Sequence, residues 1–391
     1  MEKTKSQSFP LLGLLALAMA GFIAIMTETL PAGLLPQITE GLNISEALAG
    51  QLVTLYGVGS LVAAVPVALA TQSWRRRPLL LLTILVFLIF NTVTAISTNF
   101  VLTLVSRFFA GVAAGVVWGM IAGYAMRMVP EKFKGRAMAV ALAGTPIALS
   151  IGVPAGTFLG AMMGWRLVFG IMSILSLMLI GWILWKVPDF PGQASGKRTS
   201  IGELFGTPGV IPILFVILAW MLAHNILYTY VAPFLANVGL GNYVEIVLLV
   251  FGLTALIGIW IVGAFIDRQL RLMVLVSLIV FAVASLLLVI NSANVIIVFL
   301  SVGLWGVSFG GAGTLLQTAL AHAAGEEAVD IAIPISATFW NLAIAGGGVV
   351  GGILLNMMGA DSIPWTLLII ILIALVVSWG AKKHGFIKSR G

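Results

Sequence analysis

One acidic side chain lies inside the first long apolar stretch of the sequence. Glu28 belongs to an apolar run that begins at Leu11 and is long enough to cross a lipid bilayer. A carboxylate at membrane depth is costly, roughly 2.5–3.5 kcal/mol for Asp on insertion scales, and such groups usually face a bundle interior or a water-filled path. The chemistry expected of Glu28 is therefore the binding and release of a proton within such a path.

Arg107 is the only basic residue in the interior of a predicted span, away from the span ends, and helix geometry places it at a depth similar to that of Glu28. At ~1.5 Å per residue, Glu28 lies about 25 Å along a helix that begins near residue 11, and Arg107 lies about 9 Å along an oppositely directed helix that begins near residue 101. Burial favours the protonated carboxyl group, whereas a nearby guanidinium favours the ionised one. We therefore predict a proton-coupling pair; a static ion pair that fastens two helix ends is the alternative.

A second group of chemically active side chains repeats at helical spacing. Trp220, His224 and Tyr228 lie at i, i+4 and i+8, so they share one face of a helix. Histidine titrates near neutral pH, so His224 is expected to contact substrate or to share the proton. A packed histidine is the alternative, and Tyr228 has the alternative of an aromatic belt at the membrane surface.

Other polar or amphipathic side chains at membrane depth are candidates for lining the same substrate cavity. Interhelical hydrogen bonding is the more common role of such residues and is the alternative for each of them. They are Trp118, Gln317, Trp340 and Asn341.

The composition defines the class of protein that must hold these residues. Of the 391 residues, 61% are hydrophobic and only 8% are charged, against roughly 25% charged residues in soluble proteins. A soluble core cannot bury so many apolar side chains, so the chain is predicted to be a polytopic membrane protein. The 44 glycines fit that class because small residues let membrane helices approach closely.

The residue types argue against enzyme chemistry. The chain has no Cys and its three His are far apart, so no metal site has recognisable spacing and no cofactor is expected. It also lacks a phosphate-cradling Gly-x-x-x-x-Gly-Lys-Ser/Thr loop, which argues against direct coupling to ATP. The distribution of the net charge of +7 indicates membrane topology rather than nucleic-acid binding.

The elements that position the candidate residues are twelve transmembrane helices, so the predicted fold class is an all-α membrane protein. The apolar segments near the ~20-residue spanning length are 11–35, 48–71, 79–97, 101–126, 137–161, 166–187, 209–236, 244–266, 272–290, 294–322, 332–358 and 363–381. All of the 20 Lys and Arg residues except Arg107 and Arg166 fall on the side of the N-terminus. This bias predicts cytoplasmic N- and C-termini, and we expect a multi-pass protein of the bacterial inner membrane.

The longest hydrophilic interval divides the helices into two sets of six. It covers residues 188–208, so the expected units are an N-terminal half, 1–187, a cytoplasmic linker, 188–208, and a C-terminal half, 209–391. Each half has a short basic connection after its second helix, at residues 73–77 and 267–271. The repeat indicates a transporter of two pseudo-symmetric halves with its site near the midplane between them.

Several motifs in this order resemble the Major Facilitator Superfamily. Gly263-x-x-x-Asp267-Arg268-x-x-Arg271 is similar to its cytoplasmic loop signature, and Leu104-x-x-Arg107-x-x-x-Gly111-x-x-x-Gly115 is similar to its fourth-helix motif. Gly144-Thr145-Pro146 with Gly152-Val153-Pro154-Ala155-Gly156 resembles the fifth-helix motif of its antiporters. The run Thr27-Glu28-x-x-Pro31-x-Gly33-Leu34-Leu35-Pro36 resembles sugar-efflux and multidrug-efflux permeases of the drug:proton antiporter group.

The resemblance covers all twelve spans and carries expectations about individual residues. It implies neighbouring first and fourth helices that line the cavity, and a cytoplasmic gate that includes Asp267, Arg268 and Arg271. It also implies a helix-packing role for the residues of the Gly/Pro motifs. These are Gly111, Gly115, Pro146, Gly152, Pro154 and Gly156.

The first-half loop departs from the family pattern. The stretch 68–77 lacks the Gly, the Asp and the first Arg of the signature but retains three consecutive arginines, Arg75, Arg76 and Arg77. The connection between the tenth and eleventh spans carries Glu326, Glu327 and Asp330. Opposite charges attract across a water-poor seam, so these loops are predicted to form a substitute gate; two separately solvated loops are the alternative.

These patterns together predict secondary active efflux by alternating access. A small sugar-like, amphipathic or drug-like solute would leave the cytoplasm in exchange for an entering proton, and the transporter would act as a monomer in the bilayer. Proton-coupled nutrient uptake is the main alternative, because the fold does not fix direction. An uncoupled facilitator or channel is the third.

Overall fold

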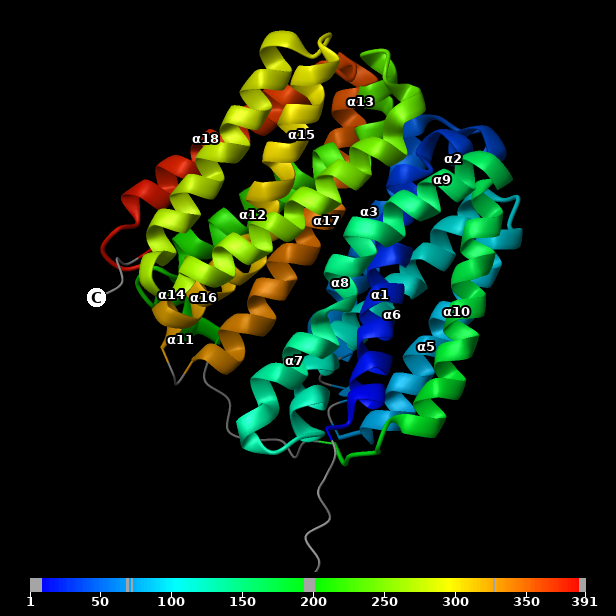
Figure 1. Ribbon diagram of the computed structural model, residues 1–391, viewed down its shortest axis with the longest axis vertical. Helices are drawn as coiled ribbons and strands as arrows, with labels where there is room; N and C mark the ends of the chain where they lie inside the picture. Colours follow the sequence, from blue (N-terminus) through cyan, green and yellow to red (C-terminus); the bar gives the residue numbers. More distant parts are fainter. Residues whose placement is uncertain (1–8, 68–69, 72, 193–200, 326–327, 387–391) are drawn as a thin grey trace, which may run out of the picture.

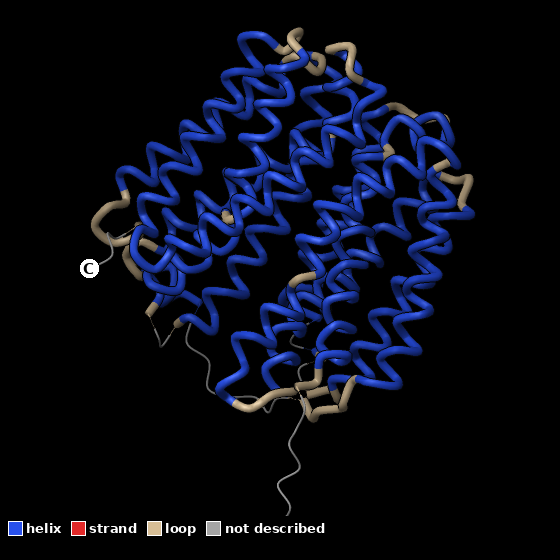
Figure 2. The backbone as a smooth tube through the Cα atoms, in the orientation of Figure 1, coloured by secondary structure: helices blue, strands red, loops and turns tan. Residues whose placement is uncertain are grey.

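The computed structural model describes residues 9–67, 70–71, 73–192, 201–325 and 328–386, and this part of the chain is helical without any β-strand (Figures 1 and 2). The α-helices of the N-terminal group are α1 (Leu11–Gly33), α2 (Leu35–Leu42), α3 (Glu46–Val62), α5 (Arg76–Ile96), α6 (Phe100–Arg127), α7 (Lys134–Leu142), α8 (Gly144–Ile147), α9 (Val153–Met163) and α10 (Trp165–Lys186). Those of the C-terminal group are α11 (Ile201–Gly206), α12 (Val210–Thr229), α13 (Val231–Asn237), α14 (Val244–Asn291), α15 (Val295–Gly310), α16 (Ala312–Ala324), α17 (Val329–Met358) and α18 (Ser362–Gly380). Short 3₁₀ or π segments are η1 (Ala63–Val67), η2 (Glu131–Phe133), η3 (Ala148–Gly152) and η4 (Gly241–Tyr243).

The helices account for the twelve predicted crossings. In the described part, 10 continuous helical segments are long and apolar enough to span a membrane. One of them contains α14, whose backbone leaves the helical conformation at Gln269, so the chain folds back there and crosses again. The shorter apolar helix Glu46–Val62 supplies the remaining crossing. The prediction of a twelve-helix membrane fold is confirmed.

Proline and π-helical segments interrupt the helices close to the centre of the molecule. The fifth predicted span is built from α7, α8, η3 and α9, and Pro146 and Pro154 flank its π-helical segment. The Ser150 hydroxyl donates to the carbonyl of Pro146 at 2.6 Å, which satisfies an acceptor inside this irregular stretch. Backbone groups freed from a membrane helix must find such partners because no water is available in lipid.

The glycines of the predicted packing motifs lie where backbones approach closely. A Cβ atom at Gly111 would overlap the backbone of Tyr56, and one at Gly115 would lie 2.7 Å from the Ser60 carbonyl oxygen. Both glycines belong to α6 and both neighbours to α3, so these two helices touch without intervening side chains. Gly152 and Gly156 face side chains of α1 in the same way.

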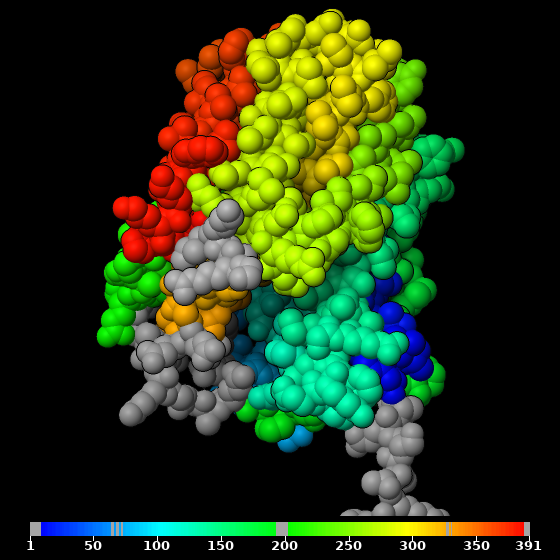
Figure 3. All heavy atoms as spheres, turned by 60° about the vertical axis from the view of Figure 1, so that its left-hand side comes forward, coloured from blue at the N-terminus to red at the C-terminus, as the bar shows by residue number. Residues whose placement is uncertain are grey.

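The N-terminal and C-terminal groups of helices meet along α3 and α17 (Figure 1). The end at which α1 begins, at the bottom of Figure 1, is called the base here, and the opposite end is called the top. Near the top, Gln51 Nε2 of α3 donates to the carbonyl of Gly348 in α17 at 3.2 Å, and the Tyr230 hydroxyl donates to the same oxygen at 2.7 Å. Toward the base, a hollow separates the teal α7 from the orange start of α17 (Figure 3).

Candidate functional site

A cavity of about 210 Å³ lies between the two groups of helices. Its walls come from α1, α8 and η3 on one side and from α12, α14, α15, α16 and α17 on the other. Most lining residues are apolar. The polar or amphipathic ones are Glu28, Thr29, Thr145, His224, Asn225, Tyr228, Thr314 and Trp340.

Glu28 is the only charged residue among the described residues that line this cavity. It lies on α1 and is partly exposed to the cavity. Its carboxylate makes no hydrogen bond or ion pair with any residue that the structure describes. A carboxyl group that faces an open space without a fixed partner is free to exchange a proton or to bind a donor on a ligand.

Arg107 is completely buried on α6, directly behind the stretch of α1 that carries Glu28. Its Nη2 atom donates to the backbone carbonyl of Thr27. That oxygen is available because Pro31, four residues further along α1, has no N–H to donate to it. The proline of the sequence motif thus creates the acceptor that holds the arginine.

Two aromatic rings complete the surroundings of the guanidinium. Its Cζ atom lies 5.1 Å from the ring centroid of Tyr56 and 5.5 Å from that of Phe169. Cation–π attraction at such distances stabilises a desolvated guanidinium. The Tyr56 hydroxyl in turn donates to the carbonyl of Ala24 at 2.8 Å, so α3 and α6 both bind the backbone of α1 near Glu28.

Glu28 and Arg107 are neighbours without being an ion pair in this structure. The two charges interact through space, but Arg107 donates to Thr27 and not to the carboxylate. The two residues lie on adjoining helices, α1 and α6, as the family resemblance implied. The static ion pair that was the alternative interpretation is not formed in this structure.

Asn91 is a functional candidate that the sequence did not single out. It lies on α5, is completely buried, and donates from Nδ2 to the Thr27 hydroxyl at 3.0 Å. The available signal was an amide side chain in the middle of the third apolar span, where an unpaired polar group would be costly.

His224 lies at the cavity wall inside a cluster of aromatic rings. Its ring stacks on Phe309 with centroids 3.7 Å apart, and Trp305 donates from Nε1 to His224 Nδ1 at 3.2 Å. With Nδ1 acting as an acceptor, a neutral His224 carries its proton on Nε2. The residue is therefore both packed, as in the alternative interpretation, and part of the cavity lining.

The remaining candidates from the sequence divide into those that reach the cavity and those that do not. Tyr228 and Trp340 line it, and Tyr228 is 4% exposed, so it does not belong to an aromatic belt at the membrane surface. Trp220 is fully buried and lies outside the lining. The structure places three further candidates outside the lining as well: Trp118, Gln317 and Asn341.

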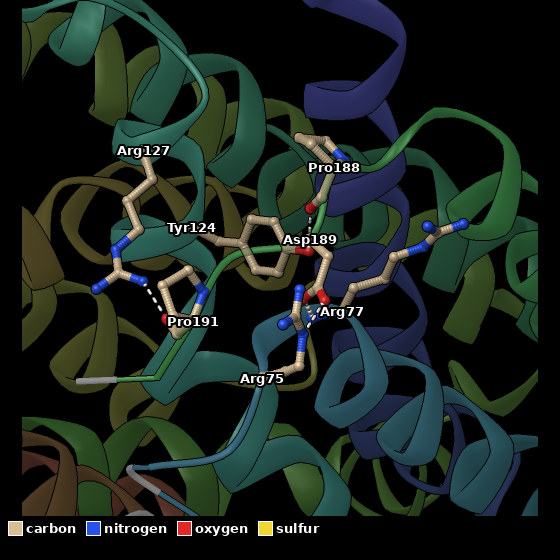
Figure 4. A network of polar contacts seen from close by, with 7 residues as sticks. All are labelled: Arg75, Arg77, Tyr124, Arg127, Pro188, Asp189 and Pro191. Atoms are coloured by element: carbon tan, nitrogen blue, oxygen red, sulfur yellow. Dashed lines mark hydrogen bonds and ion pairs between the residues drawn. The ribbon is translucent and has the colours of Figure 1, made fainter. Parts of the chain in front are cut away.

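The arginines of the first-half loop contact the chain that follows α10 (Figure 4). Arg75 forms an ion pair with Asp189, and the backbone N–H of Arg77 donates to Asp189 Oδ1 at 3.1 Å. The Tyr124 hydroxyl donates to the carbonyl of Pro188 at 2.7 Å. Slight burial raises the pKa of Asp189, but hydrogen bonds from Arg75 and Arg77 outweigh it and bring this pKa below its ordinary value.

The gate predicted between these arginines and the loop before α17 is not tested by the described residues. Glu326 and Glu327 are outside the described residues, so the substitute gate stays a prediction, and the described partner of Arg75 is Asp189 in its own group of helices. The backbone N–H of Arg76 donates to the carbonyl of Phe190 at 2.9 Å.

The corresponding loop of the C-terminal group contains Asp267, Arg268 and Arg271, next to the break of α14 at Gln269. Arg271 donates to the carbonyl oxygens of Phe386 and Trp379 at 3.0 and 3.1 Å. This arginine therefore binds the end of α18 and the chain that follows it, as Arg75 binds the chain that follows α10. No cluster of three or more metal-ligating residues occurs in the part of the chain that the structure describes.

The fold and the cavity define a class of protein: a multi-pass helical membrane protein with a central binding cavity between two groups of helices, which is the architecture of a membrane transporter. The chain belongs to the Major Facilitator Superfamily, whose family model matches residues 17–347.

Relatives and solved structures agree with this assignment. The chain is 28% identical over 354 residues to a "Probable sugar efflux transporter" of Haemophilus influenzae, with 90% of this chain and 89% of the relative covered. It is 26% identical over 362 residues to a protein of the same name from Helicobacter pylori, with 92% of each chain covered.

Two solved structures share the fold at low sequence identity. A bacterial homologue of the human lysosomal transporter Spinster, in an inward-facing and occupied conformation, superposes with a TM-score of 0.72 at 16% identity, and 95% of this chain and 96% of that chain are covered. A human organic anion transporter superposes with a TM-score of 0.67 at 16% identity, and 94% of this chain and 99% of that one are covered.

Proposed function

We propose that this transporter exports a small sugar-like solute from the cytoplasm in exchange for an entering proton. The observation that carries the proposal is the unpaired Glu28 carboxylate in the cavity between the two groups of helices. It is the acidic group among the described lining residues, and it can alternate between charged and neutral forms by direct contact with cavity water or solute. The names of the bacterial relatives support a sugar as the solute.

In this mechanism the N-terminal and C-terminal groups rock about the cavity as two halves, residues 1–187 and 209–391, joined by the linker 188–208. The top contact of Gln51 with Gly348 opens as the base closes. The base lies on the cytoplasmic side of a bacterial inner membrane, as the Lys and Arg distribution predicts. Protonated Glu28 carries the proton inward. Ionised Glu28 accepts hydrogen bonds from hydroxyl groups of the solute, so the proton and the solute occupy the site in turn.

The other cavity residues serve the solute. Trp340 and Tyr228 offer aromatic faces to the apolar faces of a sugar ring, and Thr145, Thr314 and Asn225 offer hydroxyl and amide groups to its hydroxyls. Membrane potential can drive the exchange, because each charge moved inward releases about 2.3 kcal/mol per 100 mV.

Transport by purified protein in lipid vesicles tests this proposal. Vesicles loaded with a pH-sensitive dye and supplied with labelled mono- and disaccharides should show sugar movement coupled to proton movement in the opposite direction. Movement of sugar and proton in the same direction would establish uptake by symport. Sugar movement that ignores an imposed pH gradient would establish an uncoupled facilitator.

A substitution at Glu28 identifies the proton carrier in the same assay. We expect Glu28→Gln to exchange labelled sugar across the membrane at equal concentrations but to lose accumulation driven by the pH gradient. Glu40→Gln is the matched control, because Glu40 is an exposed acidic residue of α2 outside the cavity. A Glu28→Gln protein that still concentrates sugar would remove Glu28 from the mechanism.

A further inference from the structure

Thr27 is the meeting point of three helices behind the cavity. Arg107 of α6 donates to its carbonyl oxygen, and Asn91 of α5 donates to its hydroxyl at 3.0 Å. The next residue of α1 is Glu28, which lines the cavity. A buried amide and a buried guanidinium therefore both bind the residue adjacent to the cavity carboxylate.

Hydrogen-bonding capacity is left over on both of these side chains. Arg107 Nε and Nη1 are buried and have no acceptor among the described residues, and Asn91 Oδ1 is a buried acceptor that has no donor there. Buried polar groups are nearly always paired, and an unpaired one in a native site calls for a functional explanation. Here the spare donors belong to Arg107 and the spare acceptor to Asn91, and both of these side chains bind Thr27.

The charged and titratable groups around Glu28 are few. Arg107 comes from α6 and Tyr56 from α3, while Tyr228 and its ring neighbour His224 come from α12. The guanidinium is the only cation in this set that is permanently charged at physiological pH. When Glu28 takes up a proton, Arg107 loses its nearby negative charge and depends on neutral acceptors.

We infer that Asn91 is the positioning residue of the proton exchange: its Oδ1 accepts a hydrogen bond from Arg107 while Glu28 is protonated, and releases the guanidinium toward Glu28 when that carboxyl ionises. The inference rests on the proposed proton role of Glu28. Arg107 alternates between the Thr27 side of α1, where it donates to the Thr27 carbonyl in this structure, and the cavity carboxylate. The hydrogen bond to Asn91 Oδ1 is part of the inference, because that oxygen has no donor among the described residues. The proton itself moves only between the Glu28 carboxyl group and the cavity.

Two substitutions at Asn91 should move the pH profile of transport in opposite directions. Asn91→Asp gives Arg107 a fixed anion behind the cavity. The guanidinium then stabilises ionised Glu28 less, so the pH of half-maximal transport rises. Asn91→Ala removes the neutral acceptor, so the guanidinium favours ionised Glu28 and that pH falls. Each shift should be about one pH unit, the lower end of the effect of an opposite charge within ~4–6 Å.

The contact with Thr27 survives the first of these changes, because a threonine hydroxyl can turn to donate to a carboxylate. Thr94→Val is the matched control: Thr94 lies on the same helix, is 1% exposed, and donates only to the carbonyl of Phe90 in its own helix. We expect the pH profile of this control to match that of the unchanged protein.

The measurement is sugar-coupled proton movement in vesicles from pH 5 to 9, with the amount of folded protein checked by gel filtration. If both Asn91 variants fold and keep the original pH profile, or if both shift it in the same direction, the positioning role is overturned. Failure of the proposed function looks different, because Glu28→Gln would then remain coupled. In a Glu28→Gln background, which keeps only sugar exchange at equal concentrations, Asn91→Asp should leave the pH dependence of that exchange unchanged.

Discussion

Arg107 reaches across from α6 to the carbonyl oxygen of Thr27 on α1, an oxygen that Pro31 leaves without its helical partner. A buried guanidinium is thereby held beside Glu28 without neutralising it. This arrangement keeps an arginine and a carboxyl group close enough to influence each other while the carboxyl faces the cavity. The proposed exchange of a proton for a solute depends on that separation.

Replacing the proline tests this relationship. In Pro31→Ala the new backbone N–H competes for the Thr27 oxygen, so Arg107 loses its acceptor and turns toward Glu28. Ionised Glu28 is then favoured, and the pH of half-maximal transport in vesicles should fall by up to about one unit. Pro36→Ala is the control, since Pro36 lies in the first turn of α2, where a missing N–H costs no helical bond. An unchanged pH profile for Pro31→Ala would show that Pro31 does not control the position of Arg107.

The top contact between the two groups of helices depends on glycine. A Cβ atom at Gly50 would overlap the ring and hydroxyl of Tyr230, whose hydroxyl binds the carbonyl of Gly348. We expect Gly50→Ala to separate the helices at the top and to lower transport by at least several-fold. Combining Gly50→Ala with Tyr230→Ala removes this overlap, so the cavity should again become accessible from both sides of the membrane in turn. The hydrogen bond from Tyr230 to Gly348 is absent in the double variant.

Cysteine labelling measures that separation directly, because the native chain contains no Cys. A single cysteine placed at Ala47, which is 5% exposed near the top contact, should react faster with a water-soluble maleimide in the Gly50→Ala protein. Gly170→Ala serves as the control, because a Cβ atom there meets nothing within 4 Å. Equal labelling rates in all three proteins would show that this contact does not close the top.

The hydrogen bond between Trp305 and His224 should contribute to stability. In Trp305→Phe the His224 Nδ1 atom loses its donor inside the aromatic cluster, and an unsatisfied buried acceptor costs about 1–3 kcal/mol. Thermal unfolding in detergent should therefore show a lower midpoint. The double variant Trp305→Phe with His224→Leu should recover part of the loss, since both polar partners are then absent. If the loss of stability in the double variant equalled the sum of the losses in the two single variants, the hydrogen bond would not contribute to stability.

Asp189 should fasten the segment after α10 to the base. Its ion pair with the exposed Arg75 contributes only about 0–1 kcal/mol. Its hydrogen bond to the Arg77 N–H near the start of α5 resembles a helix cap, worth about 0.5–2 kcal/mol. Asp189→Asn keeps such an acceptor and should unfold almost as the original does, whereas Asp189→Ala should unfold at a lower temperature. The reverse order of the two midpoints would contradict this assignment.

The pH dependence of this contact has a definite sign. The pKa of Asp189 lies below its ordinary value in the folded protein. A lowered pKa means that the stabilisation is complete above the ordinary aspartate pKa near ~3.9 and is lost as the pH falls through the lowered value. The difference in unfolding midpoint between the original protein and Asp189→Ala should therefore be constant from pH 5 to 8 and shrink below about pH 4. A difference that shrank between pH 6 and 7 would implicate another group.

The amino-acid sequence by itself determined the membrane fold, because each apolar segment of spanning length must form a helix whose backbone bonds are internal. It also determined the depth of Glu28 and Arg107, since rise per residue is fixed once a helix begins. Polarity within apolar spans singled out His224, Tyr228 and Trp340, which line the cavity in this structure; their contact with a solute stays a prediction.

Only the tertiary structure decided which of these groups touch. Rotation of each helix about its axis is set by packing against its neighbours, so the sequence could not tell that Trp220 lies outside the cavity lining or that Asn91 reaches Thr27. For the same reason it could not show that Arg107 binds a carbonyl freed by Pro31 rather than the carboxylate of Glu28. Depth is a property of one helix and follows from its sequence, whereas contact is a property of several helices and depends on how they pack together.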